Sequence, residues 1–243
     1  MRVPRIYVES PITPGNDCIL TGMALQHVAK VLRLKTGAEV VLFDGSGGEW
    51  RAALETIRGD HARARLLEKV MVDREPPLRW ELVQGISRGE RMDYTLQKSV
   101  ELGVAAVHPV ETRRTVVKLQ GDRAQKRREH WQGIVTSACE QSGRTRRPAV
   151  DEIRSLDLFL ARPPEGLLLL LDPEVSTHVD DLPPDRPDRI LLLAGPEGGF
   201  DDAERAAAYR AGATGLRLGP RILRTETAAV VAAALLLARW GDF

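Results

Sequence analysis

A run of five leucines at residues 167–171 constrains the fold more than any other feature, together with a second apolar run at residues 190–194. Neither run shows the alternation of apolar and polar residues that a strand with one solvated face requires. Continuous apolar strands are typical of a parallel sheet that helices cover on both faces. The second half of the chain therefore predicts an α/β domain with a mainly parallel sheet.

The remaining patterns in this half agree with that architecture. Strands and helices alternate along the chain, as they do when helices connect parallel strands. Strands are predicted at residues 82–87, 104–110 and 216–218, and helices at residues 93–102, 122–142, 201–211 and 225–240.

The first part of the chain has a different pattern. Strands are predicted at residues 39–44, 49–57 and 61–72, with one helix at residues 23–34, and a small β-barrel fits this arrangement. Two consecutive prolines in a charged segment then mark a linker, because proline continues neither a helix nor a central strand. We therefore predict a barrel domain at residues 1–72, a linker at 73–78 and the α/β domain at 79–243.

Composition limits the class of protein. Of the 243 residues, 43% are hydrophobic and 28% are charged, so the chain can bury a core. No apolar run approaches the roughly 20 residues needed to span a bilayer, and no signal-peptide pattern follows the first residues. Cys18 and Cys139 are far apart, which excludes a disulfide scaffold and a cysteine zinc site. We expect a cytoplasmic protein that is not bound to a membrane.

The net charge of +1 conceals an asymmetry along the chain. Residues 111–150 hold ten Lys and Arg against four Asp and Glu, a net charge of +6. Residues 151–243 hold ten against sixteen, a net charge of −6. A basic block is the expected footprint of a polyanionic partner, although a solvated helix face would give the same pattern.

Two loops combine features of a ligand site. Gly-Pro-Glu-Gly-Gly at residues 195–199 follows a buried strand, and residues 218–227 lead from another strand into the last helix. Glycines let the backbone approach a ligand closely, and ligands of α/β sheets bind beyond the carboxyl ends of the strands. A tight strand-to-helix turn and a capped helix are the alternative interpretations.

Motifs for several other chemistries do not occur. The chain has no GxGxxG after the first strand of the α/β domain and no P-loop sequence, and its five histidines are scattered. A dinucleotide site, a P-loop and metal catalysis are therefore not expected.

Eight segments, in order along nearly the whole chain, resemble the signatures of the RsmE family. They are residues 2–7, His27 with residues 31–33, and residues 43–45, 87–90, 97–103, 138–144, 195–199 and 218–227. That family methylates N3 of a uridine in the 16S RNA of the small ribosomal subunit, and it belongs to the SPOUT, or trefoil-knot, methyltransferases. The last two segments together are the most specific.

The resemblance implies a PUA-like RNA-binding barrel followed by a knotted α/β domain, which is an exception to the rule against threaded chains. It also implies a homodimer and S-adenosyl-L-methionine as cofactor, without a metal. The cofactor would lie in the knot, against loops that contain Leu171, Gly195, Pro196, Glu197, Gly198, Gly199, Leu218, Gly219, Ile222, Leu223, Arg224 and Thr225.

Methylation at N3 requires that the uracil loses a proton or that the site stabilises its anion. A guanidinium aimed at a uracil carbonyl favours the anion, and Arg224 is the candidate for that role. Glu197 and Glu226 are candidates for the base, and either could instead hold the loops together in an ion pair.

Basic side chains elsewhere are candidates for binding 16S ribosomal RNA, as free RNA or in the small subunit, because guanidinium groups favour phosphate contacts. These are Arg2, Arg5, His27, Lys30, Arg33, Arg88, Arg91, Arg123, Lys126, Arg127 and Arg144. Two other functions stay open: a SPOUT methyltransferase for ribose 2′-OH or transfer RNA, and a non-catalytic RNA-binding factor for ribosome assembly.

Overall fold

The computed structural model describes residues 3–15, 17–115 and 121–243. The chain forms two compact units. The first comprises Met1–Glu75 together with Thr136–Arg147, and the second comprises Pro76–Val135 together with Pro148–Phe243.

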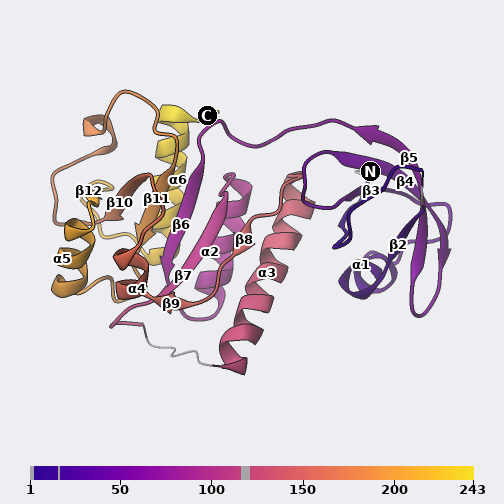
Figure 1. Cartoon of the computed structure of the whole chain (residues 1–243), viewed down its shortest axis with the longest axis horizontal. Helices are drawn as coiled ribbons and strands as arrows, with labels where there is room; N and C mark the ends of the chain where they lie inside the picture. Colours follow the sequence, from indigo (N-terminus) through magenta and orange to yellow (C-terminus); the bar gives the residue numbers. More distant parts are fainter. Residues whose placement is uncertain (1–2, 16, 116–120) are drawn as a thin grey trace. The chain divides into compact units, whose positions relative to one another are not determined.

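The second unit contains a parallel sheet (Figure 1). Its strands lie in the order β12-β10-β11-β6-β7-β8, and every ladder between them is parallel. A short strand, β9 (Arg154–Ser155), also pairs with β7. The strands of the main order are β6 (Trp80–Gly85), β7 (Ala106–Glu111), β8 (Ala149–Val150), β10 (Leu167–Leu171), β11 (Ile190–Ala194) and β12 (Thr214–Leu216).

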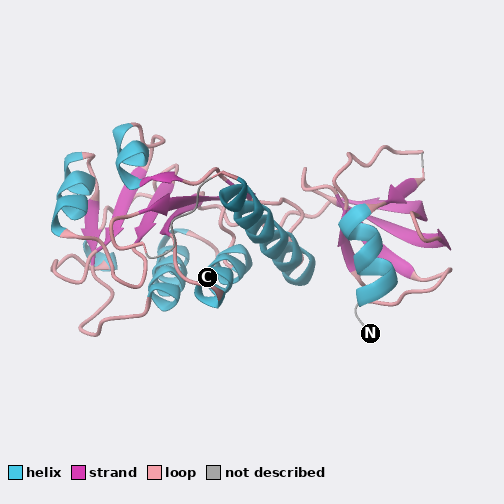
Figure 2. Cartoon of the chain, turned by 90° about the horizontal axis from the view of Figure 1, so that it is seen from below, coloured by secondary structure: helices cyan, strands magenta, loops and turns pink. Residues whose placement is uncertain are grey.

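Helices lie on both sides of this sheet (Figure 2). Helix α2 (Glu90–Glu101) packs against α6 (Thr225–Trp240), and α4 (Leu156–Ala161) packs against α5 (Asp202–Arg210). A 3-10 turn, Val179–Asp181, precedes β11. The central leucines of β10 and all residues of β11 are buried because helices cover both faces, which is the reason that these strands show no polar alternation.

The first unit has a five-stranded sheet in the order β1-β3-β4-β5-β2. The ladder between β1 and β3 is parallel, and the other three are antiparallel. Helix α1 (Gly22–Gln26) and a π-helical turn, His27–Val31, pack beside it through Leu25 and Val28. The strands are β1 (Arg5–Tyr7), β2 (Cys18–Leu20), β3 (Glu39–Phe43), β4 (Glu49–Ile57) and β5 (Ala62–Val70).

The segment Thr136–Arg147 completes the first unit. It contains the end of α3 (Asp122–Ser142), so this helix contributes residues to both units. Its contacts to the remainder of the first unit include charged groups: Arg144 pairs with Glu75, and the backbone carbonyl of Arg144 accepts a hydrogen bond from Arg5 at 2.9 Å. Arg5 in turn pairs with Glu49. All four side chains are at most about one-fifth exposed.

Most long elements agree with the sequence-based expectation. Residues 49–57, 122–142, 167–171, 190–194 and 225–240 form the predicted elements with the predicted bounds. The other predicted strands and helices are present with ends that differ by one to three residues, except residues 23–34, which divide into α1 and the π-helical turn. The short elements β1, β2, β8, β9 and α4 were not predicted, because two to six residues carry too little periodicity.

The two units differ from the predicted domain ranges in one respect. The first division, after Glu75, falls inside the predicted linker 73–78. Residues 136–147, however, belong to the first unit, although they lie in the range predicted for the α/β domain. Contacts between residues far apart in the sequence, such as the pair of Arg144 and Glu75, join this segment to the first unit, and they leave no local pattern in a sequence. Among the described residues, no helix is both long and apolar enough to cross a membrane.

Candidate active site

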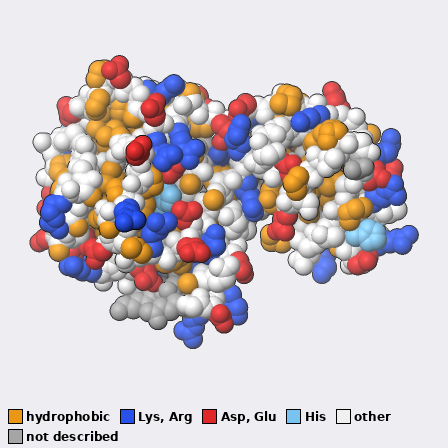
Figure 3. Space-filling view, viewed as in Figure 1, with side chains coloured by type: hydrophobic (Ala, Val, Ile, Leu, Met, Phe, Trp, Pro, Cys, Tyr) orange, Lys and Arg blue, Asp and Glu red, His pale blue; other side chains and the backbone are white. Residues whose placement is uncertain are grey.

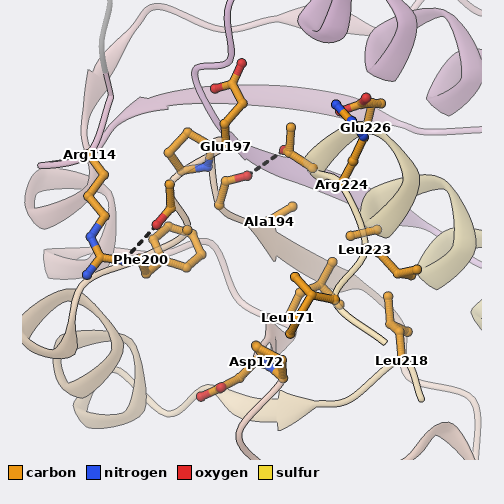
Figure 4. Close-up of a pocket in the computed structure, with 18 of the residues that line it drawn as sticks. Arg114, Leu171, Asp172, Ala194, Glu197, Phe200, Leu218, Leu223, Arg224 and Glu226 are labelled. Atoms are coloured by element: carbon orange, nitrogen blue, oxygen red, sulfur yellow. Dashed lines mark hydrogen bonds between the residues drawn. The ribbon is translucent and has the colours of Figure 1, made fainter. Parts of the chain in front are cut away.

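A pocket of about 460 Å³ lies in the second unit, at the carboxyl ends of β10, β11 and β12 (Figure 4). Three loops line it: one follows β10, one follows β11, and one leads from β12 into α6. Arg91 of α2 and Arg114, which follows β7, add two cationic side chains. This is the sheet edge at which ligands of open α/β folds bind.

The loop after β11 depends on close backbone packing. A Cβ atom on Gly195 would lie 3.0 Å from the Cα of Gly199, so a larger residue would displace the loop. Gly199 has a φ of +65°, which favours glycine, and its N–H donates to the Pro196 carbonyl at 2.8 Å. The Arg114 guanidinium donates to the Gly198 carbonyl at 2.7 Å (Figure 4). The loop is therefore a fixed wall of the pocket.

The loop before α6 forms another wall. Gly219 has a φ of +84°, and open space surrounds the position that its Cβ would occupy. The Thr225 hydroxyl donates to the Gly195 carbonyl at 2.6 Å and so joins this loop to the previous one. Arg224 is the N-cap residue of α6, and its side chain makes no capping hydrogen bond. The helix start thus brings backbone N–H groups to the pocket, where they favour polar or anionic ligand atoms.

The loop after β10 is held by Asp172, which is buried. Its carboxylate accepts hydrogen bonds from the Tyr209 hydroxyl at 2.7 Å and from the Glu174 N–H at 2.9 Å. Burial, reinforced by the hydrogen bond to Asp172, raises the pKa of Tyr209 to about 12. Glu174 itself pairs with Arg205 at 2.7 Å. Sequence patterns did not assign Asp172 or Arg205 to the site, although a charged residue directly after a buried strand is a usable signal.

The pocket brings together every residue predicted to contact the cofactor and all three predicted catalytic residues. The environments of the two glutamates differ. Glu197 accepts hydrogen bonds from the Arg88 N–H at 2.9 Å and from the Arg91 guanidinium at 3.1 Å. Partial burial favours the protonated form of Glu197, but these hydrogen bonds favour the charged form and lower the pKa of Glu197 below its usual value.

Glu226 lies at the same end of the pocket as Arg224 (Figure 4). Its Oε2 atom is buried and has no hydrogen-bond partner in the described part of the chain. Arg224 is exposed, and neither its guanidinium nor that of Arg221 has an ion pair or hydrogen bond to any described residue. Among the described residues, the pocket thus offers a buried carboxylate oxygen and two guanidinium groups that have no hydrogen-bond or ion-pair partner.

The predicted RNA-binding residues fall into three groups. Arg2 lies outside the described residues. Arg5 and Arg144 are buried, at 8% and 4% exposure, and their guanidinium groups are paired with carboxylates, so they are structural residues and not phosphate contacts. The others are exposed or partly exposed: His27, Lys30, Arg33, Arg88, Arg91, Arg123, Lys126 and Arg127.

His27 has a defined partner in the first unit. Its Nδ1 atom lies 3.0 Å from a carboxylate oxygen of Glu140, and the other oxygen of Glu140 accepts from the Tyr7 N–H at 3.0 Å. The hydrogen bond to Glu140 raises the pKa of His27 despite partial burial. On the face that Figure 3 shows, basic and acidic side chains are interspersed over each unit. No group of metal-ligating side chains is found in residues 3–15, 17–115 and 121–243.

Comparisons with known proteins agree with this geometry. A model described as an RNA methyltransferase domain matches residues 74–237, and one described as an RNA methyltransferase PUA domain matches residues 20–67. Ribosomal RNA small subunit methyltransferase E of Mycobacterium bovis is 33% identical, over 96% of this chain and 92% of its own length. The chain belongs to the ribosomal RNA small subunit methyltransferase E family. The Bacillus subtilis member is 31% identical, over 88% of this chain and 86% of its own length.

Two solved structures place this family member in its fold class. Ribosomal RNA small subunit methyltransferase E of Neisseria gonorrhoeae, bound to S-adenosyl methionine, is 40% identical over the full length of both chains, with a TM-score of 0.94. A methyltransferase of Legionella pneumophila, in complex with the same cofactor, is also 40% identical over both full lengths, with a TM-score of 0.96. The fold is therefore a PUA-like domain with a SPOUT methyltransferase domain, and the predicted trefoil knot itself stays a prediction.

Proposed function

We propose that the protein transfers the methyl group of S-adenosylmethionine to N3 of a uridine in 16S ribosomal RNA. The observation that carries the proposal is the pocket of the second unit, formed by three loops at the carboxyl ends of the parallel strands. Support comes from the family, whose Neisseria gonorrhoeae member has been solved with S-adenosyl methionine. Because the substrate is ribosomal RNA, we also infer that the protein works in the cytoplasm.

The residues present fit this cofactor. Gly195 and Gly199 leave no Cβ atoms in the wall, and Gly219 faces open space, so a flat ligand can lie against exposed backbone. Apolar side chains of Leu171, Leu218 and Leu223 provide a surface for an aromatic base. When bound, the cofactor supplies an electrophilic methyl group, and this transfer needs no metal.

We assign the action on the uracil to Arg224 and Glu226, which both line the pocket. The Glu226 carboxylate lines the pocket and keeps one oxygen without a partner among the described residues, so this carboxylate fits acceptance of the N3 proton. The unpaired guanidinium of Arg224, at the same end of the pocket, fits stabilisation of the negative charge that spreads to the uracil carbonyls. Glu197 is a weaker base because two hydrogen-bond donors stabilise its charged form. We assign Glu197 the role of holding the loop after β11 to α2.

RNA binding would use exposed cations of both units. In the first unit, Lys30 and Arg33 are exposed and His27 is partly exposed. In the second unit, Arg221 and Arg224 line the pocket and have no partner among the described side chains. Guanidinium groups without an internal partner are free to contact phosphates. The uridine would have to leave its stack to reach the pocket.

A homodimer is part of the proposal. Half of the apolar residues of α6, among them Ala233 and Leu237, are buried within their own unit, so the core explains only part of the apolar sequence of the helix. Leu235 of α6 and Tyr94 of α2 remain 38% and 47% exposed. We expect these two side chains to contact a second copy of the chain. Sedimentation of the wild type and of Leu235→Glu tests this: a dimer that the substitution weakens supports the proposal, and a fully active monomer contradicts it.

A methyl-transfer assay tests the function. The protein is incubated with cofactor carrying a labelled methyl group and, separately, with small-subunit RNA, assembled small subunits and transfer RNA. We expect label in small-subunit RNA, free or assembled, and at least a hundredfold slower transfer by Arg224→Ala. Label in transfer RNA alone would favour another SPOUT specificity. RNA binding without cofactor binding would favour a non-catalytic assembly factor.

A further inference from the structure

A fully buried glutamine lies beneath the loops of the pocket. Gln84 is near the end of β6, is 0% exposed, and is not among the described residues that line the pocket. It interrupts an otherwise apolar end of a buried strand, where a polar side chain is costly unless its hydrogen bonds are made. Its hydrogen bonds therefore show what the glutamine does at this position.

The Gln84 side-chain amide faces four acceptors. Its Nε2 lies 3.0 Å from the Gly85 carbonyl, 3.2 Å from the Gly195 carbonyl and 3.5 Å from the Ala194 carbonyl, and 3.1 Å from the Thr225 hydroxyl. The Thr225 hydroxyl already donates its proton to the Gly195 carbonyl. If the Gln84 amide were reversed, its oxygen would face only hydrogen-bond acceptors. The network thus fixes the orientation of the amide.

The oxygen of the same amide is unsatisfied. Oε1 of Gln84 is buried and has no hydrogen-bond partner within the described ranges. The Gln84 side chain therefore leaves its own oxygen without a hydrogen bond, while its amide nitrogen donates to carbonyls at the start of the loop after β11. Those carbonyls lie where the sheet ladder ends, and the next residue, Pro196, has no N–H to contribute.

The backbone at this point allows little freedom. A Cβ atom on Gly85 would lie 2.4 Å from Cδ of Pro196, so the turn after β11 packs directly on the end of β6. Gln84 and Thr225 then hold the Gly195 carbonyl from two sides. One buried side chain thereby joins the end of β6, the loop after β11 and the start of α6.

We propose that Gln84 is a positioning residue that fixes the Gly195 and Thr225 loops in the conformation that binds the cofactor. It acts through these residues and does not contact the ligand. The inference rests on the proposed function for the identity of the cofactor. The structural claim, that Gln84 orders both loops, can be measured without any ligand.

The test uses Gln84→Met, which keeps the length of the side chain and removes both donors, and Thr225→Val, which removes the hydroxyl. The control is Val107→Ala, a cavity in the neighbouring strand β7, where Val107 is fully buried. Calorimetry should show S-adenosylmethionine binding weakened at least tenfold in Gln84→Met and in Thr225→Val, and less than twofold in Val107→Ala. The double variant should lose less than the product of the two single losses, because both act on one carbonyl.

A second measurement applies without ligand. Amide hydrogen exchange of Gly199 and Ala228, whose N–H groups donate within the two loops, should accelerate at least tenfold in Gln84→Met and not in Val107→Ala. Unchanged exchange, or cofactor affinity within twofold of wild type in a folded Gln84→Met, overturns the inference. A wild type that binds no S-adenosylmethionine overturns the proposed function and leaves the exchange result to decide the role of Gln84. If Gln84→Met does not fold, Gln84→Leu, which also lacks both donors, carries both measurements.

Discussion

The two units differ in where their charged residues act. In the first unit, arginines and glutamates are buried together, and the network of Arg5, Glu49, Glu75 and Arg144 fixes the segment Thr136–Arg147 to the sheet. In the second unit, buried Glu81 is likewise paired with His108 and Arg79, but other charged residues, such as Arg224, line the pocket. Arginine therefore has a structural role in the first unit and, at Arg224, a proposed chemical role in the second.

This difference shows why a charged residue cannot be assigned a role from its type alone. Arg144 and Arg224 both stand in segments that resemble family signatures. Arg144 is 4% exposed and paired with Glu75, whereas Arg224 is exposed at the pocket. What separates them is whether a carboxylate from a distant segment reaches the guanidinium.

The largest expected effect concerns the buried network. Arg144→Ala leaves the Glu75 carboxylate without its cation, so we expect the free energy of unfolding to fall by about 3–5 kcal/mol. The matched change in the second unit is Arg91→Ala, which breaks a half-exposed pair with Glu197 and should cost about 1 kcal/mol or less. Chemical denaturation measures both. Equal losses would remove the contrast between the two units.

The next effect concerns the pocket. Gly219 and Gly212 have similar backbone conformations, with φ of +84° and +91°, and open space lies around both. Only Gly219 is among the described residues that line the pocket. Gly219→Val should therefore weaken S-adenosylmethionine binding about a hundredfold, or about 2.7 kcal/mol, whereas Gly212→Val should cost stability alone. Calorimetry measures the S-adenosylmethionine affinity of both variants. An equal loss of affinity in the two would mean that backbone strain, and not the place of Gly219 in the pocket, causes the loss.

The second unit could be predicted from the sequence better than the first, for physical reasons. The runs at residues 167–171 and 190–194 are governed by burial on both faces, which is visible in neighbouring residues. The burial of Arg5 depends on Glu49, 44 residues away, and no local pattern records that pair. Gln84 is an intermediate case: a polar residue in an apolar strand is visible, but its four acceptors come from three separate segments.

RNA binding can distinguish the exposed cations proposed to contact phosphates from an exposed arginine that is paired within the protein. Removing one cation that binds a phosphate should reduce the slope of log affinity against log salt by about 0.7–0.9. Lys30→Ala with Arg33→Ala should therefore reduce the slope by about 1–2, while cofactor affinity stays unchanged. Arg65→Ala is the control, because this exposed arginine of the first unit is paired with Glu55. A slope that responds equally to the control would show that net charge alone determines binding.

The smallest effect concerns pH. Each unit holds one histidine whose pKa is raised: His27 by its hydrogen bond to Glu140, and His108 by hydrogen bonds to Asp151 and Glu81 that outweigh burial. A histidine with a higher pKa in the folded state stabilises fully below its unfolded pKa of about 6.5, and this contribution is lost as pH rises through the folded value. We expect the unfolding free energy to decline above about pH 6.5, and to decline less in His27→Gln and in His108→Gln. Denaturation of the wild type and both variants between pH 6 and pH 9 measures this, and parallel declines would exclude the histidines as the cause.

At acid pH we expect the unfolding free energy to fall as the pH decreases, and a different group, Glu81, to be responsible. Burial opposes ionisation of Glu81, but hydrogen bonds from His108 and Arg79 lower its pKa from 4.5 to about 2. Its contribution is therefore present above about pH 4.5 and is lost as pH falls towards 2. Denaturation of Glu81→Gln between pH 5 and pH 2 should show a shallower acid decline than the wild type. An identical decline would exclude Glu81 as its source.

The position of the transferred methyl group is the most direct test of uridine N3 as the acceptor. Small-subunit RNA is methylated with a deuterated methyl donor, digested to nucleosides and analysed by tandem mass spectrometry. We expect a single methylated uridine whose label stays with the base after the ribose is cleaved, and which matches an N3-methyluridine standard. A label that leaves with the ribose, or that lies on another base, would contradict the assignment of N3.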